Sequence, residues 1–275
     1  MPEPIITGAV VTAAAKAAAS EAGKDSASLL KRLLGPSVDE FGQALARSVA
    51  YRTRNFGRIA EKADRKATSM PADGIVSYRL AYQMLEEGSL CDDELTAEYL
   101  GGLLAASRSP GGRDDRAASW CRIVSGMSTF QIRAHFILYR EWAERLHDMP
   151  DISIRIQHGT ATMHAELHEF ASVMRGDSPI SEDDALQDGI NGLDAASLIG
   201  DYAVGPRRGE LSDSEFAETV RVLPSFRGLE LYGWAQGLPG LLTEDFTTKA
   251  VVFETDPPVP RLTRVSLPYY TTPGS

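Results

Sequence analysis

Three histidines gather near the middle of the chain, at a spacing that metal chemistry could use. His158, His164 and His168 fall within eleven residues. His164 and His168 are four residues apart, the spacing of two zinc ligands on one helix, and Glu166 and Glu169 lie beside them. However, the run HAELH lacks the second-position glutamate of HExxH, and no PCxxC run follows as in zinc deaminases. The pattern predicts a polar helix face and no metal, which leaves a metal-dependent hydrolase at His158–His168 as the least favoured alternative.

Other motifs that carry chemistry do not occur in the sequence. It contains no GxxxxGK[ST] phosphate loop, no GxGxxG fingerprint and no GxSxG nucleophile elbow. Cys91 and Cys121 form no CxxC pair, which suits a reducing compartment. The carboxylates Asp92, Asp93 and Glu94 open a predicted helix, where they would stabilise its amino-terminal end. The sequence therefore predicts no catalytic residue and no cofactor, and it favours a non-enzymatic protein.

Composition describes a soluble globular protein. Hydrophobic residues make up 43% of the 275 residues, and the formal net charge is −10. Because nucleic-acid binding needs a net basic surface, this charge disfavours a general nucleic-acid binder. The apolar run at 5–15 follows Glu3 rather than positive charge, and it is shorter than the roughly 20 residues that span a bilayer. We therefore expect a cytoplasmic protein.

The first half of the chain is expected to be helical, with short connections. An Ala-rich helix is expected over 1–24, and a helical bundle over 25–148. Apolar spacing and turn signals place the bundle helices at 38–67, 75–90, 91–109 and 116–147, the last of them broken near 125–129. Trp120, Trp142 and Trp234 are scattered, as expected of core residues.

The second half, 149–275, is expected to be a smaller α+β region. It is acidic, with sixteen Asp/Glu against five Lys/Arg over 177–256. Helices are predicted at 159–174, 181–199 and 225–237, and strands at 219–223, 249–255 and 262–267. A helix pair followed by short strands would allow a winged-helix-like module. The predicted fold is therefore mainly α, with a bundle followed by this α+β part.

One basic helix stands out from this acidic background. Residues 47–66 hold seven Lys/Arg against two acidic residues, and the apolar residues of 38–67 follow a separate stripe. The basic side chains proposed for interaction are Arg47, Arg54, Arg58, Lys62 and Arg65. They could be a solvated face covered by acidic surface of the same protein, a site for a protein partner or an anionic membrane, or a nucleic-acid contact. The first interpretation needs nothing beyond the fold itself, and the acidity of the chain disfavours the last.

Two ordered blocks of this sequence resemble the abortive-infection alpha (Abi-alpha) family of bacterial domains. The first runs LLGPSVDEFGQALARSVAYRTRNFGRIAEKADRK, with Gly35-Pro36, Arg54-Asn55 and Glu61-Lys62 at the family's characteristic places. The second, LEEGSLCDDELTAEYLGGLLAAS, has the Leu-Glu-Glu turn and the acidic DDEL before a helix. The run GGLLAAS departs from the family, which commonly has Asn near the end of this helix. The resemblance covers roughly residues 29–145.

The resemblance implies an antiviral role in bacteria, in which an infected cell is killed or arrested. We expect a non-enzymatic protein that acts by protein contact or by recruitment to the inner face of the membrane, where the basic helix would meet phospholipid headgroups. The alternative is an oligomeric helical sensor or scaffold, in which the bundle self-associates and the acidic half binds a protein partner. A winged-helix DNA-binding regulator is a weaker possibility, because the C-terminal half is acidic.

Overall fold

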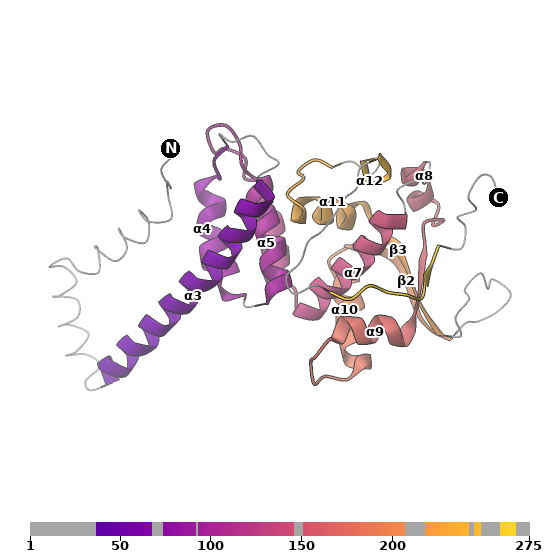
Figure 1. Cartoon of the computed structure of the whole chain (residues 1–275), viewed down its shortest axis with the longest axis horizontal. Helices are drawn as coiled ribbons and strands as arrows, with labels where there is room; N and C mark the ends of the chain where they lie inside the picture. Colours follow the sequence, from indigo (N-terminus) through magenta and orange to yellow (C-terminus); the bar gives the residue numbers. More distant parts are fainter. Residues whose placement is uncertain are drawn as a thin grey trace. The chain divides into compact units, whose positions relative to one another are not determined.

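The computed structural model describes residues 37–67, 74–91, 93–145, 151–206, 218–241, 245–248 and 259–267, with side chains from Ala46 onward in the first range. Two compact units divide the chain, Met1–Tyr51 and Arg52–Ser275. The long helix α3, Ser37–Ala67, begins in the first and ends in the second (Figure 1). The helix predicted within 1–24 and the strand predicted at 249–255 lie outside the described residues.

Helix α3 forms where the spacing of apolar residues predicted it. In the second unit its stripe is buried at Ile59, Ala63 and Ala67, while Phe56 packs at the edge of the core. In the first unit, residues 46–51 are all exposed. Among the side chains described from Ala46 onward, the amphipathic pattern therefore buries one face of α3 in the part that belongs to the second unit.

The remaining helices of the first half follow in short succession. Asp93 caps one of them by accepting hydrogen bonds from the Thr96 N–H at 2.8 Å and the Thr96 hydroxyl at 2.9 Å, as a capping carboxylate should. The predicted break near 125–129 is confirmed, because one helix ends at Gly126 and the next starts at Thr129. These elements are α4 (Tyr78–Glu86), the 3₁₀ turn η1 (Gly88–Leu90), α5 (Glu94–Ala106), α6 (Ala117–Gly126) and α7 (Thr129–Arg145).

An aromatic cluster around His135 forms the centre of the core. The Tyr99 hydroxyl and His135 Nδ1 are 2.7 Å apart, and the Tyr139 hydroxyl donates to the Leu198 carbonyl at 2.5 Å. Complete burial lowers the pKa of His135 to about 3. This histidine is therefore neutral at physiological pH and serves packing. The three tryptophans are also buried, which confirms the prediction that they are core residues.

The C-terminal region contains a small antiparallel sheet with strand order β2-β3-β1-β4. Strand β1 pairs with both β3 and β4, and β3 pairs with β2. Its elements are α8 (Ile152–Gln157), β1 (Met163–Glu166), α9 (Leu167–Arg175), α10 (Glu182–Ala195), β2 (Ile199–Pro206), β3 (Glu218–Pro224), α11 (Phe226–Ala235), α12 (Asp245–Thr248) and β4 (Val265–Ser266). The mainly α fold with a smaller α+β part is confirmed.

In chain order α7, α8, β1, α9, α10, β2 and β3 follow one another, and the winged-helix-like module stays a prediction. Helices α7, α9 and α10 pack on one another, and α9 also packs on β3 (Figure 1). Sequence reasoning missed β1, because it extended the helix of α9 back to residue 159, and it missed β2 altogether. The predicted domain boundaries at 24 and 148 stay predictions, since both positions lie outside the described residues.

Candidate functional site: the charged junction of α3 and α5

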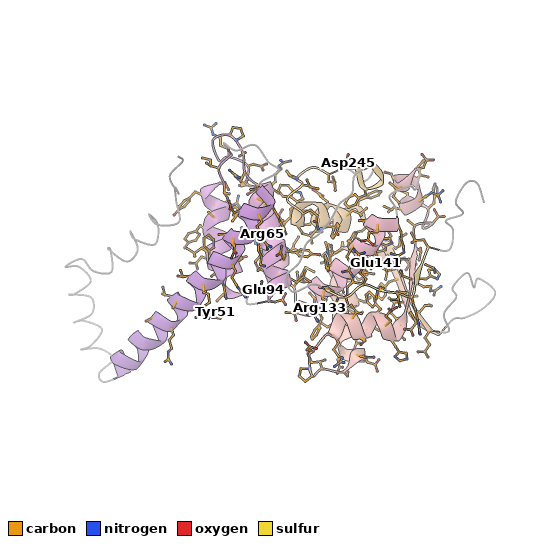
Figure 2. All side chains as sticks on the ribbon, viewed as in Figure 1. Tyr51, Arg65, Glu94, Arg133, Glu141 and Asp245 are labelled. Carbon is orange, nitrogen blue, oxygen red and sulfur yellow. The ribbon has the colours of Figure 1, made fainter. Side chains whose placement is uncertain are left out.

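Two glutamates of α5 meet four cations of α3. Glu94 and Glu98 are one helical turn apart, so both face the same neighbour. Lys62 Nζ lies 2.8 Å from Glu94 Oε2 and 2.9 Å from Glu98 Oε1. Arg58 also pairs with Glu94, and Arg65 and Lys66 pair with Glu98 at 2.8 and 3.0 Å. We call these six residues the α3–α5 charge cluster; Figure 2 labels Arg65 and Glu94 on the two helices.

The cluster is anchored by a carboxylate that has almost no contact with water. The side chain of Glu98 is 1% exposed and that of Lys62 is 7% exposed. Burial by itself raises the pKa of Glu98, but Lys66 and Lys62 outweigh this effect and hold the pKa below its usual value. Burial likewise lowers the pKa of Lys62, and the two glutamates more than reverse the shift. Each charge is therefore retained only because its partners are in place.

Lys66 extends the cluster to a third helix, α11. Its ammonium donates to the Glu98 carbonyl at 2.7 Å and to the Ala235 carbonyl at 3.0 Å. Because Lys66 is largely desolvated, its pKa falls to about 8 despite the attraction of Glu98. The junction thus joins α3 and α5 to the end of α11 through backbone acceptors as well as side chains.

The Gly-Gly pair in α5 allows these helices to approach closely. A Cβ on Gly102 would lie 1.9 Å from the Ala235 carbonyl oxygen, and one on Gly101 would lie 2.7 Å from the Cβ of Lys62. No side chain fits at position 102, because the obstructing atom is the backbone carbonyl oxygen of Ala235. This requirement explains the two glycines of the GGLLAAS run.

The structure separates the five basic residues proposed for interaction. Arg58, Lys62 and Arg65 belong to the α3–α5 charge cluster, whereas Arg47 and Arg54 are exposed. Sequence reasoning missed Lys66 and Glu98, and it assigned Glu94 only to the amino-terminal end of α5. The i, i+4 spacing of Glu94 and Glu98 opposite the basic stripe was the available signal. Asp92 lies outside the described residues.

The histidines do not form the helical pair that their spacing allowed. His158 ends α8, the buried His164 lies in β1, and the exposed His168 lies in α9. The assumption that His164 and His168 share a helical face is therefore wrong. His168 lies 3.8 Å from Glu182 and 3.5 Å from Glu218. Over the described ranges, no three His, Cys, Asp or Glu residues are placed to hold a metal ion.

Helix α10 presents acidic side chains in the part of the chain for which a winged-helix-like module is predicted. It carries five acidic residues and no Lys or Arg, and Asp183, Asp184 and Asp188 are exposed. In DNA-binding proteins of the helix-turn-helix type, the second helix of such a pair enters the major groove. Here that helix would meet the phosphates with like charge, which is unfavourable.

Comparison of the chain with protein-family profiles, curated proteins and solved structures gives no match. Among the residues that the structure describes, no helix is both long and apolar enough to cross a membrane.

Proposed function

We propose that this protein is an antiphage protein of the abortive-infection type, which arrests or kills an infected bacterium by binding rather than by catalysis. The proposal rests on the resemblance of two sequence blocks to the Abi-alpha family. The observation that supports it is the α3–α5 charge cluster, because its cations come from the first block and its glutamates from the second. Because buried ion pairs join the two sequence blocks, we expect α3 and α5 to act together as one structural unit.

The distribution of basic side chains favours a protein partner over a membrane. Three of the five proposed residues, Arg58, Lys62 and Arg65, already neutralise Glu94 and Glu98. Lys62 in particular is buried, and to meet lipid headgroups it would have to leave the buried Glu98 carboxylate, which is costly. Arg47 and Arg54, the exposed pair, keep recruitment to an anionic membrane as a second candidate. The acidic face of α10 also suits a protein partner.

A phage challenge tests the defence role. Bacteria expressing the protein are infected with a panel of phages at low and high multiplicity, with empty vector as the control. We expect protection at low multiplicity and collapse of the culture at high multiplicity. Absence of protection against the whole panel, in cells that contain the soluble protein, would contradict the proposal.

A pair of matched variants separates the two kinds of partner. Arg47→Glu/Arg54→Glu reverses the exposed end of the basic stripe, and Arg113→Glu/Arg122→Glu makes the same change at exposed positions elsewhere. Salt-sensitive binding to vesicles of anionic phospholipid, lost only in the first variant, would establish membrane recruitment. Protection by wild-type protein that does not bind such vesicles would favour the protein partner.

A further inference from the structure

The two most exposed aromatic side chains of the described residues lie together on α4. Tyr78 is 84% exposed and Tyr82 is 54% exposed. Their rings stack with centroids 6.3 Å apart and an interplanar angle of 26°. Single exposed apolar residues are ordinary, but two adjacent tyrosines on one helix face form a patch of the kind found at protein interfaces.

This pair is held in place by the opposite face of the helix. Leu80 and Met84 are fully buried, and Ser77 caps α4 by accepting from the Leu80 N–H at 3.3 Å. Tyr78, Tyr82 and Glu86 follow one another at intervals of four residues, so they form a single outward stripe. We call this stripe the tyrosine face. Its rigid backbone reduces the entropy lost when it binds a partner.

Opposite charges flank the tyrosines along the helix. Arg79 lies near the first turn, with its side chain 69% exposed, and Glu86 ends the helix, 49% exposed. Their present partners are Asp115 and Arg52, at 2.8 and 3.8 Å. Since all four side chains of these pairs are at least one-third exposed, exchanging one partner for another costs little.

This order of charges is self-complementary. If two copies of α4 pack antiparallel about an axis between residues 82 and 83, Arg79 of each copy faces Glu86 of the other. A two-fold axis makes that contact twice and brings four tyrosines together. A parallel pairing would place Arg79 against Arg79 and Glu86 against Glu86, which is unfavourable.

We propose that the tyrosine face binds the same face of a second copy of this chain, and so forms a two-fold symmetric dimer. The proposal goes beyond the proposed function, since the dimer forms or fails to form whether or not the protein acts against phages. A face built on one short helix is smaller than a standard interface, so we expect a dissociation constant on the order of 10–100 µM.

Sedimentation equilibrium from about 2 µM to about 200 µM brackets this dissociation constant. Wild-type protein is expected to shift from monomer to dimer across the range, and Tyr78→Ser/Tyr82→Ser to weaken the dimer at least about tenfold. Phe226→Ser, which removes an exposed aromatic side chain from α11, is the matched control and should leave the shift unchanged. A monomer at all concentrations would overturn the proposal, as would a dimer that both variants preserve.

A charge exchange tests the antiparallel register. Arg79→Glu and Glu86→Arg should each weaken the dimer, because each places like charges across the axis. The double variant restores opposite charges and should recover most of the affinity. If the double variant is as weak as the sum of the single changes, this register is wrong and the proposal fails.

Cross-linking identifies what occupies the face. In a Cys91→Ser background, Tyr82→Cys places a thiol near the axis, and oxidation should give a disulfide-linked dimer that Phe226→Cys does not give. A monomer whose Cys at position 82 resists alkylation would assign the face to another segment of the same chain. A monomer whose thiol alkylates readily would mean that the tyrosine face is open and binds a different protein. Either result would overturn the proposed dimer.

Discussion

The α3–α5 charge cluster and the outer face of α10 use the same kind of residue in opposite ways. In the cluster, Glu98 is almost completely buried and meets three cations. On α10, Asp188 is exposed and accepts hydrogen bonds from the neutral side chains of Ser128 and Gln131. Both helices carry charges at one-turn spacing, yet only the first set joins helices through buried ion pairs, whereas Asp188 contacts α7 through exposed hydrogen bonds to neutral groups. Burial and opposing charge, rather than spacing alone, decide whether a helical charge stabilises the fold.

Glu98→Gln should give the largest change. It removes the carboxylate that pairs with the desolvated Lys66 and leaves Lys62 with Glu94 alone, so we expect the free energy of unfolding to fall by about 3–5 kcal/mol. Urea denaturation measures the loss. Glu61→Gln, the same chemical change at an exposed position of α3, should alter stability by less than about 0.5 kcal/mol. If Glu98→Gln and Glu61→Gln lowered the free energy of unfolding equally, burial would not decide how much a charge stabilises the fold.

Gly102→Ala should come next, because it tests the close approach that brings the cluster together. The added methyl group would overlap the Ala235 carbonyl, and we expect a loss of about 1–3 kcal/mol. Gly57→Ala is the control, since a Cβ there meets no atom within 4 Å. In the interior of α3 that change should stabilise by about 0.5–1 kcal/mol. Calorimetry should show a lower melting temperature for Gly102→Ala and a higher one for Gly57→Ala. A change in the same direction for both variants would contradict the close approach at Gly102.

The buried His135 predicts a pH dependence. Its pKa is lowered to about 3 in the folded protein, so the unfolded chain takes up the proton first as the pH falls below about 6.5. The stability that depends on neutral His135 is therefore fully present above pH 6.5 and is lost progressively down to about pH 3. The expected slope is about 1.4 kcal/mol per pH unit.

His135→Asn tests this dependence with little change of shape. Its amide oxygen can accept from Tyr99 but does not titrate, so the slope of stability against pH between 6.5 and 5 should flatten. Urea denaturation at a series of pH values gives the slope. An unchanged slope would show that other groups carry the dependence.

Asp183→Asn on α10 should have the smallest effect, within about 0.5 kcal/mol in either direction, because an exposed carboxylate contributes little to stability. Thermal denaturation is the measurement. A loss of more than about 1 kcal/mol would mean that the acidic face is structural, and would weaken its assignment to a partner.

Local sequence patterns correctly predicted helices that form from their own residue spacing. They missed strands β1 and β2, whose formation depends on hydrogen-bond partners in distant segments. The apolar spacing of α3 and the break before Thr129 are readable along the chain. The run MHAELHEF has helical spacing, yet Met163–Glu166 forms a strand because β3 and β4 supply hydrogen-bond partners far along the sequence. Strand β2 was not predicted because it contains Gly200, Gly205 and Pro206, residue types that are rare inside strands. The i, i+4 spacing of Glu94 and Glu98 was visible in the sequence, but the contact of Lys62 with Glu98 spans 36 positions, so the spacing alone did not identify the partner helix.

The basic residues near the end of α3 serve a buried junction rather than a surface site. A double-mutant cycle of Lys62→Met and Glu98→Gln, measured by urea denaturation, tests this role most directly. The account predicts that the double variant is more stable than the sum of the single losses implies, with a coupling of about 2 kcal/mol or more, as in a buried pair. A coupling below about 0.5 kcal/mol, typical of exposed ion pairs, would contradict it and return Lys62 to the residues available for a partner.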